Sequence, residues 1–305
     1  MKFPTLLLRL LVVGLFATVT VGAQAADKHV LLVAGNPSHG PGQHEHNAGV
    51  QLLAKCLAGV PGLKVDVLLN SAPAPAGAIE RADAVIIFSD GGLRHVMFTA
   101  DYLTRLDALA ARGGGIGLLH YAVEPAADKG QPEVLRWIGG AFEINWSVNP
   151  HWTPRFQPLP SHPITRGVKP FTIQDEWYFN LRFTGNQAAL TPLLVAVPPA
   201  ETMARKDDPH AGNPQVRAAV AAGKPQTVAW AFERPGGGRG FGFTGAHFHQ
   251  NWGDENFRKL VLNAIVWLAK VDVPAGGIVS TVTPEDLQAH LDVKPAPKPK
   301  AAEKR

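Results

Sequence analysis

The chain has 305 residues, of which 46% are hydrophobic and 18% are charged, so it can bury a sizeable core in one large domain or two small ones. Its formal net charge is +4, but without the basic N-terminal leader and the lysine-rich C-terminal tail the remainder carries about −2. That balance excludes a nucleic-acid binder on electrostatic grounds. Cys56 is the only cysteine, which excludes an intrachain disulfide.

The N-terminus has the pattern of a secretory signal peptide. Lys2 and Arg9 precede an apolar run at 10–21, and the letters AQA at 23–25 provide an A-x-A cleavage site. The run is too short to span a bilayer, and no later segment is long and apolar enough to do so. We therefore predict a signal peptide at 1–25, a periplasmic or secreted mature protein, and no stable membrane insertion.

The first half of the mature chain alternates between apolar runs and helical patterns. We predict strands at 29–35, 63–69, 83–88 and 115–119, and helices at 48–57 and 99–112. The first of these strands is apolar almost throughout, as a strand covered on both faces is. The alternation predicts a three-layer α/β fold, in which a mainly parallel sheet has helices on both faces.

The second half of the chain is less regular. We predict helices at 131–138 and 256–268, and strands at 151–157, 190–197, 227–232 and 241–245. We also predict a hairpin turn at 234–240 and a polar surface loop at 201–225. One α/β domain would then span 26–272. The remaining extension, 273–305, is rich in proline, lysine and alanine, and we expect it to be disordered at its end, from Lys294 onward.

Polar residues that follow predicted strands are the first candidates for a functional site. His120 ends the strand at 115–119, and His247 follows the last predicted strand. In open α/β sheets ligands bind outside the carboxyl ends of the strands, although a histidine there can also merely complete a turn. Asp175 and Glu176 are neighbours that would point to opposite faces of a strand, so we expect one of them, Glu176, to face the site.

Four motifs occur in an order and spacing that point to one protein family. They are GGGIGLLH at 113–120, SHPITRG at 161–167, DEWY at 175–178 and GRGFGFTGAH at 238–247. Together they resemble the ThuA-like family, named for trehalose utilisation, over most of the mature chain. The resemblance implies a class I glutamine amidotransferase-like, flavodoxin-like architecture. The place of the amidotransferase cysteine holds His120 or Tyr121 here, and neither can form a thioester, so we expect no glutamine hydrolysis.

With that fold, the motif residues would converge on one cleft. We expect His120, Glu176 and His247 to be catalytic, because imidazoles pass protons near neutral pH and a carboxylate can orient one of them or act as a base. Tyr178 could donate a hydrogen bond to a developing oxyanion. The expected substrate-binding residues are His46, Asp175, Tyr178, Tyr121, Asn145, Trp146 and His249.

The leader and the candidate residues lead us to expect an exported enzyme that uses His/Glu acid–base chemistry. The resemblance implies that its substrate is a carbohydrate, such as a keto-sugar or a disaccharide derivative. Two alternatives stay open. The missing cysteine nucleophile also fits a non-catalytic sugar-binding or accessory module. A divalent-metal-dependent hydrolase or isomerase is suggested by His39, His44 and His46 in one loop, since such histidines can bind zinc. No complete ligand set has a recognised spacing, so the cofactor and the oligomeric state are left open.

Overall fold

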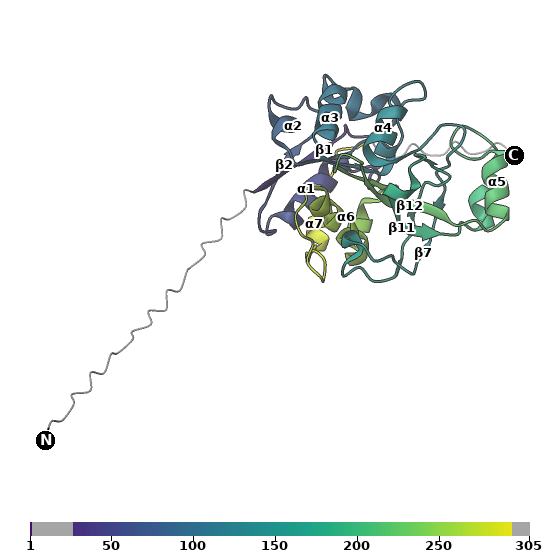
Figure 1. The fold of residues 1–305 in the computed structure, drawn as a ribbon. Helices are drawn as coiled ribbons and strands as arrows, with labels where there is room; N and C mark the ends of the chain where they lie inside the picture. The colour runs from purple at the N-terminus through teal and green to yellow at the C-terminus, as the bar shows by residue number, and fades with distance from the viewer. Residues whose placement is uncertain (2–26, 295–305) are drawn as a thin grey trace.

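The computed structural model describes Met1 and residues 27–294 of the chain (Figure 1). Apart from Met1, the predicted signal peptide at 1–25 lies outside the described residues, and so does the predicted disordered end at 295–305. Within 27–294, none of the helices combines the length and the apolar character needed to cross a bilayer.

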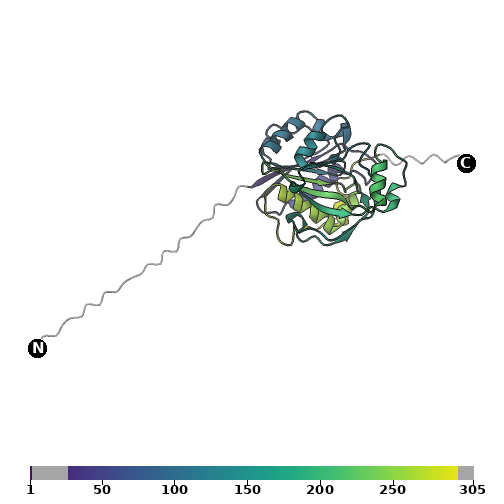
Figure 2. The ribbon, with the colours of Figure 1, turned by 45° about the vertical axis from the view of Figure 1, so that its right-hand side comes forward.

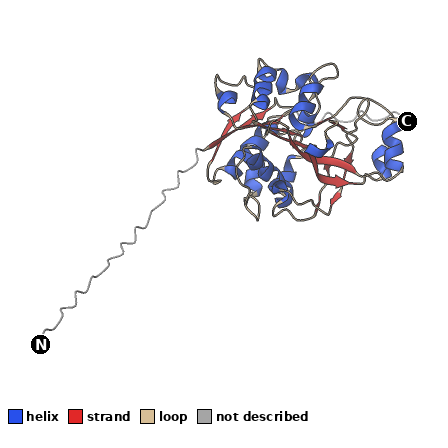
Figure 3. Cartoon of the chain, in the orientation of Figure 1, coloured by secondary structure: helices blue, strands red, loops and turns tan. Residues whose placement is uncertain are grey.

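A seven-stranded sheet forms the middle layer of the fold (Figure 3). Its strands are β1 Lys28–Ala34, β2 Leu63–Leu68, β3 Ala84–Phe88, β4 Gly115–Leu119, β11 Leu190–Ala196, β12 Gln226–Glu233 and β13 Arg239–Phe243. They lie in the order β11-β12-β13-β4-β3-β1-β2. The pairs from β13 to β2 are parallel, and β12 and β11 extend the sheet in antiparallel pairing.

Helices cover both faces of the sheet, which confirms the predicted three-layer α/β architecture (Figure 1, Figure 2). They are α1 His46–Leu57, α2 Ala78–Arg81, α3 Tyr102–Ala111, α4 Gln131–Ile138, α5 Pro214–Ala221, α6 Glu255–Leu268 and α7 Pro284–Gln288. In β1, Val30 and Leu32 pack on the side of α1 and α6, whereas Leu31 and Val33 pack on the side of α2 and α3. Burial on both sides explains why β1 and β3 are apolar almost throughout, whereas the edge strand β2 alternates between apolar and polar residues.

The parallel strands end at the same edge of the sheet and so bring distant segments together. The loop at 35–45 follows β1, Asp90 follows β3, His120 follows β4 and His247 follows β13. This carboxyl edge is where ligands bind in open α/β sheets. The sheet therefore positions the candidate site.

Short strand pairs build the region between α4 and β11. They are β5 Gly140–Ala141 with β10 Arg182–Phe183, β6 His151–Trp152 with β9 Asp175–Glu176, and β7 Arg155–Phe156 with β8 Phe171–Thr172. The prediction of one continuous strand at 151–157 is wrong: β6 and β7 are separated at Thr153 and Pro154, and proline has no N–H for a ladder bond. The pairing of β6 with β9 sets His151 opposite Glu176.

The prediction of a polar loop at 201–225 is also wrong in part, because this segment contains α5. The side chain of Asn213 caps the helix by accepting the backbone N–H of Val216 at 2.9 Å. Val216 and Val220 are buried. Their spacing of four residues places both on one helical face, a pattern too short to stand out in a polar segment.

Residues 273–294 pack against the α/β domain. Val273 and Ile278 are buried. Lys294 forms an ion pair with Glu45 in which Nζ and Oε1 are 3.1 Å apart, and both side chains are buried. The expectation that disorder begins at Lys294 is therefore wrong for that residue, because a buried carboxylate far away in the sequence holds it in place.

Candidate functional site

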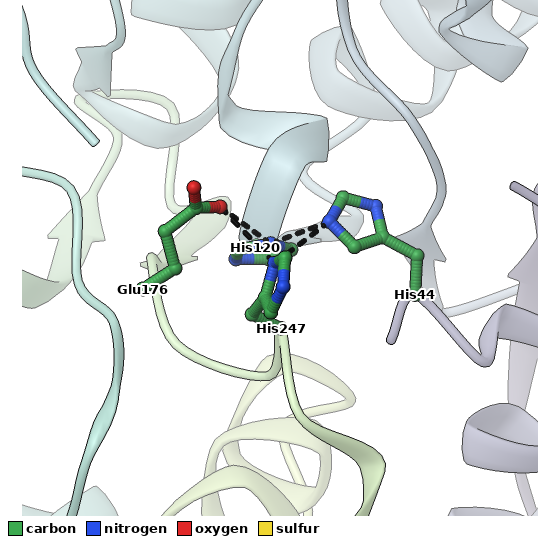
Figure 4. A group of neighbouring side chains, drawn as sticks. All are labelled: His44, His120, Glu176 and His247. Atoms are coloured by element: carbon green, nitrogen blue, oxygen red, sulfur yellow. Dashed lines mark hydrogen bonds and ion pairs between the residues drawn. The ribbon is translucent and has the colours of Figure 1, made fainter. Parts of the chain in front are cut away.

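A polar cavity of about 430 Å³ opens at the carboxyl edge of the sheet. It is lined by His39, His44, Tyr121, Asn149, Glu176, Tyr178, Arg205, Asp208, Pro209 and His210. A larger cavity of about 740 Å³ lies elsewhere, among residues that include Lys28 and Cys56. Because the smaller cavity adjoins the cluster of His44, His120, Glu176 and His247, its chemistry rather than its volume makes it the candidate site (Figure 4).

His120 begins a 3₁₀ turn directly after β4, and we call this first residue after the strand the elbow position. It has a φ of 54°. Non-glycine residues in this conformation cluster at functional sites. The ring Nδ1 lies 2.8 Å from the carbonyl oxygen of Thr244, which can only accept, so Nδ1 carries the proton. The unprotonated Nε2 lies 3.1 Å from Nε2 of His44. Burial and the neighbouring histidines hold the pKa of His120 well below its ordinary value, so the ring is neutral.

His44 comes from the loop after β1 and is held in the same protonation state. Its Nδ1 lies 3.0 Å from Oδ1 of Asp90, which also accepts a hydrogen bond from the Ser38 hydroxyl at 2.8 Å. Burial would raise the pKa of Asp90, but these hydrogen bonds outweigh it and keep the pKa below its usual range. The ionised carboxylate therefore accepts the proton of Nδ1, and Nε2 faces the cluster. Burial lowers the pKa of His44 to about 3.

Glu176 supplies the carboxylate of the cluster. Its Oε2 lies 3.1 Å from Nδ1 of His247 and 3.6 Å from Nε2 of His120, and the Tyr178 hydroxyl donates to it at 3.3 Å. Its Oε1 lies 3.6 Å from Nε2 of His151. Burial would raise the pKa of Glu176, but interactions with His151 and His247 hold it well below its usual value, so the group is ionised. The same carboxylate raises the pKa of His151.

Asp175 has separate surroundings and fixes the turn that carries His247. Its carboxylate accepts the backbone N–H groups of Ala246 at 2.8 Å and His247 at 3.0 Å, and the side-chain amide of Asn251 at 2.9 Å. Ala246 has a φ of 86°, so the turn needs such support. The carboxylate of Asp175 thus contacts the backbone of the 246–247 turn, whereas that of Glu176 contacts the imidazoles of His120 and His247.

The two predicted tyrosines lie at the cavity, and two predicted histidines lie outside it. Tyr121 and Tyr178 are among the lining residues. His46 is buried at the start of α1, where its Nδ1 bonds the carbonyl oxygen of Asn36 at 3.0 Å. His249 is buried too, and burial lowers the pKa of both His46 and His249 to about 4.

Asn145 and Trp146 do not line the cavity. The backbone N–H of Asn145 donates to the carbonyl oxygen of Pro209 at 2.8 Å, and the Trp146 ring packs under the guanidinium of Arg182. Asn145 therefore supports the cavity wall at Pro209, whereas Trp146 packs on a residue outside the lining. Of the loop histidines, His39 stacks on the ring of His44 with 3.5 Å between ring centroids.

Several residues of the site were not among the predicted ones. Asp90 ends the turn after β3, so the strand-end rule that selected His120 could have found it. His151 had no such signal, because its place beside Glu176 depends on the pairing of two very short strands.

The segment between β11 and α5 supplies one wall of the cavity. Arg205 donates to the side-chain oxygen of Asn149 at 2.8 Å. Nε2 of His210 lies 3.1 Å from Oε1 of Glu124, whose pKa is raised by burial; the carboxylate in turn raises the pKa of His210. This wall was missed because the segment was predicted to be a surface loop.

Among residues 27–294, two groups of side chains have the composition and proximity to hold a metal ion. His44, His120, His247 and Glu176 each offer one ligand atom, and these atoms lie within 4.8 Å of one another. His39, His44 and Asp90 meet the same criterion. Imidazole nitrogens and carboxylate oxygens are common ligands of divalent ions.

Comparison with known proteins identifies relatives of this fold. The sequence model of the ThuA family, described as trehalose utilisation, matches residues 29–268. A crystal structure of a ThuA-like protein from Bacteroides uniformis ATCC 8492 matches with a TM-score of 0.58 and 16% identity, over 83% of this chain and 96% of that chain. One from Parabacteroides merdae ATCC 43184 matches with a TM-score of 0.53 and 14% identity, over 86% and 99%. None of the curated proteins matches the chain.

Proposed function

The chain belongs to the ThuA family, which supports a role in carbohydrate utilisation, and on this premise we propose that it is an enzyme that removes a proton next to the carbonyl of a keto-sugar derivative. Glu176 is the proposed base. The observation that carries the proposal is its ionised carboxylate at the cavity wall, beside the hydroxyl of Tyr178. We also propose that the enzyme is exported, on the strength of the leader pattern at 1–25.

Glu176 can accept a proton, but its strongly lowered pKa makes it a weak base that must pass the proton on. His151 is placed to receive it, with Nε2 at 3.6 Å from Oε1 of Glu176. The His151 side chain is 46% exposed, so its ring can exchange protons with solvent. The carboxylate and the imidazole would thus share the work of a base near neutral pH.

Tyr178 is suited to stabilise negative charge on the substrate oxygen. Burial raises its pKa well above the ordinary value, so the hydroxyl stays protonated and can donate to an enolate oxygen. Asn149, Arg205 and His210 add polar groups that suit sugar hydroxyls. His120, also expected to be catalytic, is neutral and fully buried, which favours a binding role over proton transfer.

Hydrolysis of an ordinary glycoside fits the cavity less well. Most glycosidases use two carboxyl groups that flank the bond to be cleaved. Among the described residues that line the cavity, the carboxylates are Glu176 and Asp208. Oδ1 of Asp208 already accepts the backbone N–H of His210 at 2.7 Å. The proposal likewise includes no glutamine hydrolysis, because His120 holds the elbow position.

Mass spectrometry of a substrate panel tests this proposal. Purified protein is mixed with disaccharides and their 3-keto forms, and product is measured for the wild type and for Glu176→Gln. We expect turnover of a keto form that falls at least about 100-fold in the variant, the lower range of what acid–base catalysis contributes. Glu133→Gln makes the same chemical change on α4, outside the cavity lining, and should leave turnover unchanged.

Two results would count against the proposal. Equal turnover by the wild type and Glu176→Gln would remove Glu176 from the chemistry. Absence of turnover across the panel, together with thermal stabilisation by one sugar, would instead identify a sugar-binding module.

A further inference from the structure

We infer that His44, His120, His247 and Glu176 bind one divalent transition-metal ion, zinc or an ion of similar preference. The inference rests on the proposed function for the ion's use in catalysis, whereas binding itself is argued from geometry. Only His44 is shared with the loop histidines that the sequence suggested as ligands.

Four of the six separations between the ligand atoms are close to those of a tetrahedral site, and all six are within 4.8 Å. Zinc–nitrogen bonds of about 2.0–2.1 Å place neighbouring ligand atoms about 3.4 Å apart. Nε2 of His44 lies 3.0 Å from Nδ1 of His247 and 3.1 Å from Nε2 of His120. Oε2 of Glu176 lies 3.1 Å from the same His247 atom and 3.6 Å from the same His120 atom. These separations lie on both sides of the tetrahedral value, so one ion could reach all four atoms after small shifts.

The contact between His44 and His120 lacks a proton that could make it a hydrogen bond. Nδ1 of His120 donates to a carbonyl oxygen, and Nδ1 of His44 donates to an ionised carboxylate, so each neutral ring turns a lone pair inward. The two inward Nε2 atoms are only 3.1 Å apart. Both rings are buried, with His44 1% and His120 0% exposed, so water cannot separate them. The Tyr178 hydroxyl lies 3.3 Å from Nε2 of His120, and Nδ1 of His247 lies 3.0 Å from Nε2 of His44, so each could donate to one of these lone pairs. A shared cation satisfies both lone pairs at once and also relieves the contact between the two Nε2 atoms.

The outer hydrogen bonds also distinguish this set from the competing one. Metal-binding histidines typically donate their other ring N–H to a carboxylate or a carbonyl, as His44 does to Asp90 and His120 does to Thr244. In the set of His39, His44 and Asp90, the His44 nitrogen that faces Asp90 is already used in that hydrogen bond. The side chain of His39 is also 37% exposed. The buried set of four is therefore the better site.

The ligand types select the ion and leave room for the proposed chemistry. Three imidazoles and one carboxylate suit zinc and related late transition metals better than magnesium or calcium. A cation here would lie beside the cavity, and it would polarise the carbonyl oxygen of a substrate by taking that oxygen as a fifth ligand. Glu176 would bind through Oε2 and keep Oε1 directed at His151 for proton transfer.

Metal binding can be measured without any substrate. The full protein is stripped with a chelator, dialysed, and titrated with Zn²⁺ and Co²⁺ by calorimetry, and bound metal is counted by elemental analysis. We expect one ion per chain, a higher melting temperature with Zn²⁺, and the visible absorption of nitrogen-ligated Co²⁺. Absence of stoichiometric metal in every assay would overturn the inference.

Matched histidine variants decide which set binds the ion. His247→Gln and Glu176→Gln should weaken Zn²⁺ binding at least about 100-fold, and Asp90→Asn by about 10–100-fold through loss of the outer hydrogen bond. His39→Gln, which makes the same chemical change as His247→Gln, should bind Zn²⁺ like the wild type. If His39→Gln loses the ion and His247→Gln keeps it, the four-residue site is wrong. Circular dichroism of each metal-free variant shows whether it is folded, so that lost binding is not confused with lost folding. If His247→Gln fails to fold, Glu176→Gln still tests the site.

The same samples separate the two proposals. Stoichiometric Zn²⁺ without turnover of any keto sugar would support the metal site and contradict the enzyme function. Turnover that persists in fully stripped protein would support the enzyme and overturn the metal's role in it.

Discussion

The turn at 246–247 depends on the buried carboxylate of Asp175, which accepts hydrogen bonds from the backbone N–H groups of Ala246, His247 and Glu176 and from the side chain of Asn251. In Asp175→Asn one oxygen becomes an NH₂ group that faces a donor. We expect the free energy of unfolding to fall by about 1–3 kcal/mol, the cost of an unsatisfied buried polar group. Turnover should fall as well, because His247 loses its support.

Urea unfolding and steady-state kinetics measure these two effects of Asp175→Asn. Asp128→Asn is the matched control, since Asp128 is exposed. If Asp175→Asn is as stable and as active as this control, Asp175 does not position the turn.

His210 should make stability depend on pH. Glu124 raises the pKa of His210, so the imidazolium stabilises the fold fully below its unfolded pKa of about 6.5. This stabilisation is lost as the pH rises through the raised folded pKa. His210→Gln should therefore lower the melting temperature more at pH 6 than at pH 9. A larger difference at pH 9 would contradict the assigned His210–Glu124 pair.

The C-terminal extension, residues 273–294, is tied to the histidine loop. Lys294 pairs with Glu45 just before α1, and both side chains are buried, at 2% and 1% exposure. Its ammonium also donates to the backbone carbonyl of His44 at 3.2 Å. Lys294→Met would leave Glu45 buried without its partner, so we expect a loss of about 3–5 kcal/mol in the free energy of unfolding.

Urea unfolding tests this link between the extension and the loop. The double variant Lys294→Met with Glu45→Gln should recover part of the lost stability, because no unpaired charge stays buried. Lys55→Met removes a lysine whose side chain is 57% exposed from its ion pair with Asp286, and should have little effect. Equal losses for Lys294→Met and Lys55→Met would show that the buried pair does not hold the extension.

At the scale of the whole molecule, the hydrophobic pattern of the sequence predicted most of the strands and helices, but not the contacts between distant segments. The parallel strands and the helices α1, α3, α4 and α6 were predicted because apolar runs and helical spacing specify them within a few residues, whereas the four-residue helix α2 was not predicted. The β6–β9 pairing, α5 and the place of Lys294 were not, because each depends on contacts between distant segments.

The candidate site divides in the same way. His120 and His247 were predicted because they follow strands. Glu176 was predicted because it and its neighbour Asp175 point to opposite faces of a strand. The strand-end rule could also have indicated Asp90. Nothing local places His44 beside His120, since their contact joins residues 76 positions apart.

The central claim is that Glu176 removes a proton next to a carbonyl of the bound sugar. Proton NMR in D₂O tests it most directly, with the keto sugar that the wild type turns over. The account predicts solvent deuterium at the carbon next to the carbonyl, appearing at least about 100-fold more slowly with Glu176→Gln. Turnover with no deuterium at that carbon, or equal rates for the two proteins, would contradict it.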